Sequence, residues 1–155
     1  MMDTRQLFFA LLEQIAETEP KLMFLTGDLG YSFMEDFAEK YPDRFINCGI
    51  AEQNMVGVAA GLAHRGMKPV VYSGAKFLLY RAIEQIRDDV VYQGLDVKFV
   101  GTGAAGFLGF THNLADSENP KHIVTRIPDF RYAEPRDYGS MKTALTLPGA
   151  TFIKL

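Results

Sequence analysis

The chain has 155 residues, 48% of them hydrophobic, which suits one globular domain with an ordinary apolar core. Its 16 basic and 19 acidic side chains give a formal net charge of -3 without long runs of one sign, so the charge gives no case for binding nucleic acid or an anionic membrane. Cys48 is the only cysteine, which excludes an internal disulfide. The sequence shows no signal sequence and no apolar run of roughly 20 residues, so we expect a cytoplasmic location without membrane insertion.

Apolar periodicity predicts helices and strands in alternation along the chain. A helix is predicted over 5–17 and a short buried strand over Leu22–Thr26. Further helices are predicted at 32–40, 51–65, 76–92 and 137–146, and further strands at 45–48, 69–73, 97–100, 130–133 and 151–154. This alternation indicates an α/β fold in which residues 1–155 form one domain, a single doubly wound, mainly parallel sheet with helices on both faces. Ligands of such folds bind at the carboxyl ends of the strands.

One such end is the segment Gly-Ile-Ala-Glu-Gln-Asn-Met at 49–55, which follows a strand and opens a helix. Gly57 and Gly61 lie on the same side of that helix and would let another backbone or a second subunit approach closely. On spacing alone, the better interpretation of Glu52 is a solvated glutamate that favours the helix dipole in the first turn.

Two other strand ends have structural interpretations as well. Phe77 and Tyr80 are three residues apart after the strand at 69–73, and core packing is the default explanation of that spacing. Ser32 and Glu35 satisfy the Ser-x-x-Glu capping-box pattern, and Asp28 has the character of an ordinary turn residue.

A fourth segment, Gly-Thr-Gly-Ala-Ala-Gly at 101–106, satisfies the pattern G-x-G-x-x-G. This pattern makes a nucleotide-binding module an alternative interpretation of the chain. That fingerprint should open a helix, whereas 107–120 has an irregular pattern. The loop leads instead to Thr111 and His112, and a lone histidine is more often structural or solvated than catalytic.

Taken together, these segments resemble the transketolase family, including its two-subunit members and the deoxyxylulose-phosphate synthases. The resemblance runs from about Phe24 to Leu155 and rests on Gly-Ile-Ala-Glu-Gln-Asn-Met-Val-Gly-Val-Ala-Ala-Gly-Leu-Ala at 49–63 and on Arg-Ala-Ile-Glu-Gln-Ile-Arg at 81–87. It implies the pyrimidine domain of the thiamine diphosphate-binding fold. It also implies that Glu52 hydrogen-bonds N1′ of the cofactor's aminopyrimidine and favours the imino tautomer, which takes the proton from thiazolium C2.

The resemblance assigns further roles. Phe77 is expected to stack on the aminopyrimidine, with Tyr80 in the same pocket. Asp28 is expected near the cofactor across a subunit interface, and Ser32 is expected to contact a sugar-phosphate substrate. His112 is expected to reach the donor substrate, which makes it the second catalytic candidate after Glu52.

The sequence also departs from the family. Gly74 stands where a phenylalanine is frequent, a change that would enlarge the site. Leu108 replaces an acidic residue four before the histidine, and Glu134 replaces the arginine that grips substrate phosphate. A ketose or keto acid is therefore expected as substrate, without a prediction that it is phosphorylated.

The diphosphate-binding half of a thiamine enzyme is not recognisable here, because no Gly-Asp-Gly with a downstream asparagine occurs. The sequence also ends at 152–155, where the family's pyrimidine domain ends. We expect no metal ligand on this chain, and a partner subunit that holds the diphosphate and Mg²⁺ in a heterotetramer with self-dimerised pyrimidine domains. The expected reaction is two-carbon ketol transfer or related carbanion chemistry. The alternative is a non-catalytic binding or regulatory subunit with the same fold.

Overall fold

The computed structural model describes residues 3–103 and 119–155, whose six strands form one sheet in the order β2-β1-β3-β4-β6-β5. The strands are β1 (Leu22–Thr26), β2 (Phe45–Asn47), β3 (Lys68–Gly74), β4 (Lys98–Thr102), β5 (Arg131–Ala133) and β6 (Thr151–Lys154). All neighbouring pairs in this sheet are parallel, which confirms the predicted doubly wound parallel sheet. The strand order reverses direction between β1 and β3.

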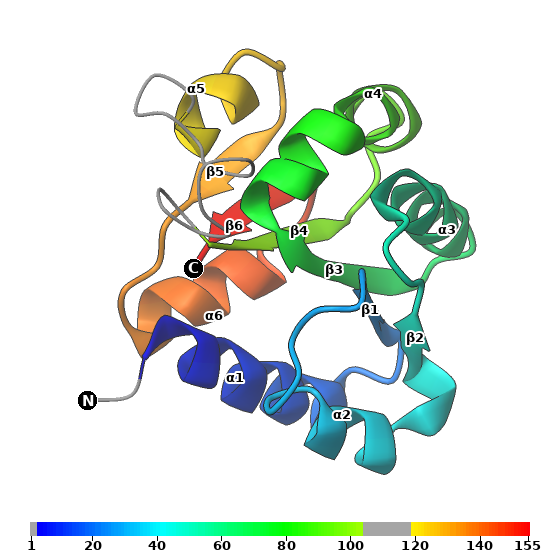
Figure 1. Ribbon diagram of the computed structural model, residues 1–155, viewed down its shortest axis with the longest axis vertical. Coiled ribbons are helices and arrows are strands. Elements are labelled where there is room, and N and C mark those ends of the chain that lie inside the picture. The colour runs from blue at the N-terminus through cyan, green and yellow to red at the C-terminus, as the bar shows by residue number, and fades with distance from the viewer. Residues whose placement is uncertain (1–2, 104–118) are drawn as a thin grey trace.

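Helices cover both faces of the sheet (Figure 1). One face is covered by α1 (Thr4–Thr18), α2 (Glu35–Lys40) and α6 (Tyr138–Thr146), and the other by α3 (Glu52–His64), η2 (Phe77–Arg81), α4 (Ile83–Gln85), η3 (Ile86–Val91) and α5 (Pro120–Val124). The short η1 (Pro42–Arg44) precedes β2. Within the described residues, no helix is long and apolar enough to cross a membrane.

The two layers between sheet and helices differ in composition. The layer under α1 is aromatic, with the Phe8 and Tyr72 rings stacked at 5.8 Å and Phe9 edge-on to Phe24 at the same separation. The layer under α3 is mainly aliphatic, and Met55 and Leu78 are fully buried in it. Burial on both faces explains why β1 and β3 read as continuous apolar runs.

The helix predicted over 76–92 is present but is not a regular α-helix. Two π-helical segments, η2 and η3, flank the single turn of α4. Such wide turns are rare and occur frequently at functional sites. The first of them contains Phe77 and Arg81.

Two other elements differ from the prediction. The helix predicted from residue 32 begins at Glu35 because Ser32 has a positive φ of 70°. The backbone N–H of Ser32 donates to Glu35 Oε1 at 2.9 Å, but α2 has no side-chain cap, so only half of the predicted capping box forms. The helix α5 was not predicted, although Asn119 as cap and Pro120 in the first turn are a recognised start signal.

The start of α6 gives a pH-dependent prediction. The Asp137 side chain accepts a hydrogen bond from the Ser140 backbone N–H at 2.8 Å, and this bond lowers the pKa of Asp137 below its ordinary 3.8. A carboxyl group with a depressed folded-state pKa stabilises the fold above its unfolded-state pKa and loses that contribution as the pH falls through the folded-state value. We expect Asp137→Ala to lower Tm at pH 7, and the difference from wild type to shrink by about pH 3.

Thermal melts at both pH values check this, with Asp137→Asn as the matched control because asparagine caps a helix without titrating. The asparagine variant should remain near wild type at pH 7. A loss of Tm in Asp137→Ala that is the same at both pH values would contradict the assignment.

Candidate functional site

Parallel α/β sheets bind ligands where the strand order reverses, outside the carboxyl ends of the strands. Here that place lies between β1 and β3, where Gly27 follows β1 and Ser73 lies near the end of β3. Glu52 reaches the same place from the first turn of α3, and Ser73 Oγ donates to its Oε1 at 3.0 Å. A Cβ on Gly27 would lie 3.1 Å from Ser73 Oγ and 3.5 Å from Glu52 Oε1, so glycine gives these two side chains room to meet.

Glu52 is buried, with 2% of its surface exposed. The interpretation of this residue as a solvated glutamate, based on spacing alone, is therefore wrong. Its second carboxylate oxygen, Oε2, accepts from Arg81 Nη1 at 3.2 Å. A buried carboxylate without partners would be costly, so Ser73 and Arg81 stabilise it in this position. Residues 50–54 and Arg81 line a hollow at the start of α3.

The Phe77 ring lies next to Arg81, which is one of the residues that line this hollow. The ring packs on Gly74, where an added Cβ would lie 2.8 Å from Phe77 Cδ2. Phe77 therefore fills the space that we expected Gly74 to leave open. The Arg81 guanidinium carbon lies 4.2 Å from the centre of the Phe77 ring, within cation–π range. Arg81 thus contacts both Glu52 and Phe77.

Asp28 lies in the loop after β1 and has a positive φ of 59°. Its Oδ1 accepts hydrogen bonds from the Tyr31 hydroxyl at 2.5 Å and from Asn47 Nδ2 at 3.0 Å. These bonds, the one from Tyr31 most strongly, lower the pKa of Asp28. Asn47 Oδ1 in turn accepts from the Gly49 backbone N–H at 3.0 Å. Asp28 therefore ties the loop after β1 to the loop that leads into Glu52.

The other predicted site residues are less closely connected with Glu52. Tyr80 follows Phe77 in η2 and is 48% exposed. Ser32 lies on the exposed loop before α2. His112 and Leu108 lie outside the described residues.

The first glycine of the G-x-G-x-x-G segment has a steric explanation. Gly101 lies inside β4, where a Cβ would overlap Phe152 and lie 2.9 Å from Ala75 Cα. Glycine is therefore required for packing at this position, whatever the loop binds. Gly106 lies outside the described residues.

Sequence reasoning gave no separate role to several residues that build the site. Arg81 is four residues after Phe77, and helical neighbours at that spacing share a face, which is a signal that was available. Ser73, Tyr31 and Asn47 gave no comparable signal, because their contacts with Glu52 and Asp28 depend on how the strand ends meet.

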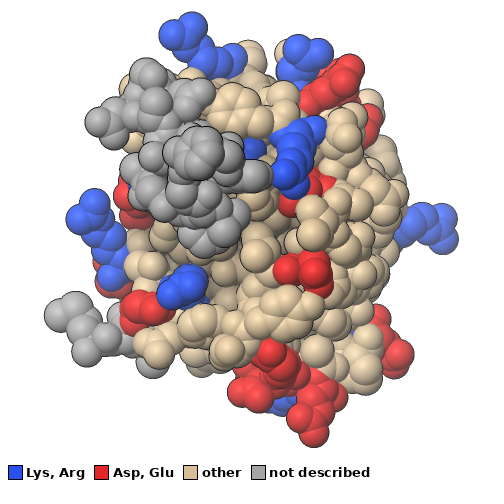
Figure 2. Space-filling model, in the orientation of Figure 1, with Lys and Arg blue, Asp and Glu red and all other residues tan. Residues whose placement is uncertain are grey.

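The surface around the site has mixed charge. Figure 2 shows acidic and basic side chains interspersed over the face viewed, with acidic side chains gathered at its lower edge near α2. The charge pattern of this face therefore does not indicate a polyanionic partner.

The fold and the site define a parallel α/β ligand-binding domain with a buried glutamate at the point where the strand order reverses. Residues 1–148 match the family model described as "Transketolase, pyrimidine binding domain". The chain belongs to the transketolase family, as the resemblance predicted, and membership of this family implies thiamine diphosphate as the cofactor.

Several relatives are separate subunits. The chain is 38% identical over 117 residues to an apulose-4-phosphate transketolase subunit of Phocaeicola vulgatus, covering 73% of this chain and 38% of that protein. It is 33% identical over 159 aligned positions to the 6-deoxy-6-sulfo-D-fructose transketolase subunit SqwH of Clostridium sp., covering 97% of this chain and 48% of that protein. The chain thus spans less than half the length of these two curated relatives.

Solved structures show the same fold. A "Split gene transketolase, inactive beta4 tetramer" superposes with a TM-score of 0.84 at 32% identity, covering 98% of this chain and 50% of that one. A transketolase from Campylobacter jejuni superposes with a TM-score of 0.82 at 19% identity, covering 97% of this chain and 25% of that one, a likeness of fold alone.

Proposed function

We propose that residues 1–155 act as the pyrimidine-binding domain of a thiamine diphosphate-dependent, transketolase-like transferase. In this proposal Glu52 activates the cofactor and a partner subunit holds the diphosphate and Mg²⁺. The observation that supports it most is the burial of the Glu52 carboxyl group at the point where the strand order reverses, in a residue that helps to line a hollow.

The residues at this place suit an aminopyrimidine. A flat heteroaromatic ring needs an aromatic face to stack on, and Phe77 offers one. A ring nitrogen that must share a proton needs a carboxyl group within hydrogen-bond reach, and Glu52 supplies a buried carboxyl group at this place. Tyr80 and Asp28 would complete the surroundings of the ring.

The cofactor, when bound, supplies an electron sink for two-carbon ketol transfer or related carbanion chemistry. The residues of this chain orient the cofactor ring and move protons to and from it. Ser73 donates to Glu52 Oε1 and so orients the carboxyl group, while Oε2, which accepts from Arg81, would be the oxygen that meets the ring nitrogen N1′. Phe77 fixes the plane in which the ring lies. Ser32 and His112 are the residues that we propose contact the substrate.

The relatives support a partner and a ketose substrate. Two of them are named as transketolase subunits, for apulose 4-phosphate and for 6-deoxy-6-sulfo-D-fructose, and both names describe ketoses. We propose a hetero-oligomer with two copies of each chain. Gly57 and Gly61 are exposed on α3 with open space beside them, which leaves that face available for a second pyrimidine domain. A non-catalytic subunit is not favoured, because Glu52, Phe77 and their supporting residues are present and in contact.

Co-expression with a diphosphate-domain subunit from the same genome tests this proposal. We expect the two chains to co-purify with about one thiamine diphosphate per pair of chains, and this chain purified alone to retain none. Failure to form a complex, or equal retention of cofactor by this chain alone, would contradict the proposal.

A further inference from the structure

Arg81 contacts both side chains that the proposed function assigns to the cofactor ring, Phe77 and Glu52. We infer that Arg81 is a placeholder: its guanidinium group contacts both Phe77 and Glu52, and the aminopyrimidine enters only after this group has moved out. The inference rests on the proposed function, since that proposal defines where the ring lies.

Arg81 contacts two surfaces of the site, the ring of Phe77 and the carboxyl group of Glu52. Its guanidinium carbon lies 4.2 Å from the centre of the Phe77 ring, and its Nη1 donates to Glu52 Oε2 at 3.2 Å. A guanidinium group is flat and donates hydrogen bonds in its plane, so it meets the same two surfaces as an aminopyrimidine. Aromatic rings stack with their centres roughly 4.5–7 Å apart, and the guanidinium group already fills that layer over Phe77.

Arg81 and the ring nitrogen also meet the same carboxylate oxygen. The ion pair engages Oε2, the oxygen that the proposed function reserves for the ring nitrogen. A carboxylate oxygen has two lone pairs, so the conflict is one of space. The guanidinium group that donates to Oε2 also lies over the Phe77 ring, where the aminopyrimidine would stack, so Arg81 leaves when the ring enters.

The site is built so that Arg81 can leave without disturbing Glu52. The Arg81 side chain is 42% exposed, whereas that of Glu52 is 1% exposed. The guanidinium group therefore has a direct path to solvent, and the carboxyl group does not move with it. Ser73 Oγ, which is fully buried, keeps its hydrogen bond to Oε1 and so holds the carboxyl group in place.

The experiment measures the affinity of thiamine diphosphate with Mg²⁺ for the complex of this chain and its diphosphate-domain subunit. The test variant is Arg81→Met, which keeps the length of the side chain and removes the guanidinium group. We expect it to bind about 5-fold more tightly than wild type, which corresponds to a wild-type site that Arg81 closes about 80% of the time.

Arg87→Met is the matched control. Arg87 also pairs with a carboxylate, Asp88, at 2.8 Å, and also lies over an aromatic ring, that of Tyr92, at 5.8 Å. Its side chain is 48% exposed, close to the value for Arg81, but its contacts do not include Glu52. We expect the control to bind with wild-type affinity.

The outcomes separate this inference from the proposed function. Equal or weaker binding by Arg81→Met, with normal binding by wild type, would overturn the placeholder and leave the proposed function standing. Absence of binding by wild type and by both variants would overturn the proposed function, and the placeholder with it.

A second measurement does not depend on how the variant folds. In the wild-type complex, the ¹⁵N signal of Arg81 Nε should move to a solvent-exposed position as thiamine diphosphate is added, while that of Arg87 stays unchanged. An Arg81 signal that stays unchanged at saturation would overturn the inference.

Discussion

Replacing Glu52 with glutamine is expected to slow exchange of the C2 proton of thiamine diphosphate by at least about 100-fold in the assembled complex. General acid–base catalysis by a positioned side chain contributes roughly 10²–10⁴-fold. Glutamine has the shape of glutamate and can still accept from Ser73, but it cannot take up or release a proton. Hydrogen–deuterium exchange at C2, followed by NMR, measures this step without knowledge of the substrate.

Glu84→Gln is the control, because Glu84 is an exposed glutamate in α4, shortly after Arg81. It should leave the exchange rate unchanged. Exchange in Glu52→Gln within about 3-fold of wild type, with the cofactor bound, would show that Glu52 has no part in proton transfer.

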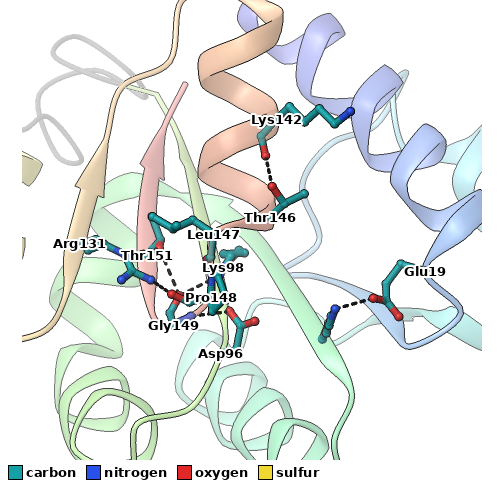
Figure 3. Close-up of polar contacts among 11 residues, drawn as sticks. Glu19, Asp96, Lys98, Arg131, Lys142, Thr146, Leu147, Pro148, Gly149 and Thr151 are labelled. Atoms are coloured by element: carbon teal, nitrogen blue, oxygen red, sulfur yellow. Dashed lines mark hydrogen bonds and ion pairs between the residues drawn. The ribbon is translucent and has the colours of Figure 1, made fainter.

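The largest expected effect on stability comes from Lys98, the first residue of β4. It lies at the amino ends of the strands, whereas Glu52 lies at their carboxyl ends. Its amino group is buried and donates to the carbonyl oxygens of Leu147 at 2.7 Å and Gly149 at 2.8 Å, and it pairs with Asp96 (Figure 3). Burial lowers the pKa of this amine, and the pair with Asp96 opposes that shift. One side chain thus joins β4 to the connection between α6 and β6.

We expect Lys98→Met to lower the free energy of unfolding by about 3 kcal/mol, because two carbonyl groups lose their donor and Asp96 loses its cation. The lost ion pair with Asp96 accounts for the smaller part of this decrease in the free energy of unfolding, because the Asp96 side chain is 36% exposed and solvent screens its charge. Urea unfolding measures the difference. Lys142→Met, an exposed lysine on α6, should stay within about 0.5 kcal/mol of wild type. Equal stability of the two variants would contradict this role of Lys98.

The sequence predicted the sheet well because its strands are short apolar runs between clear turn residues. The strand over Leu22–Thr26 has the predicted bounds, and the strand predicted at 151–154 does as well. The π-helical turns of η2 and η3 were not predicted, because apolar periodicity near 3.6 residues does not distinguish a wide turn from a regular one. The helix α5 was missed for want of apolar periodicity over its five residues.

The site was predictable only in part. Local spacing favoured a solvated Glu52, and its burial follows from the way Gly27 and Ser73 meet it across the sheet. The resemblance identified Glu52 and Phe77, which the structure places around Arg81. Their roles in the reaction stay predictions. So do those of the remaining candidates, Asp28, Ser32, Tyr80 and His112.

The most direct test of the central claim is calorimetric titration of thiamine diphosphate and Mg²⁺ into this chain alone and into its mixture with the diphosphate-domain subunit, each with wild type and with Glu52→Ala. We predict binding to the wild-type mixture, no binding to this chain alone, and weaker binding to the Glu52→Ala mixture. Absence of binding in every setting would contradict the account and leave a transketolase-like fold with a structural or regulatory role.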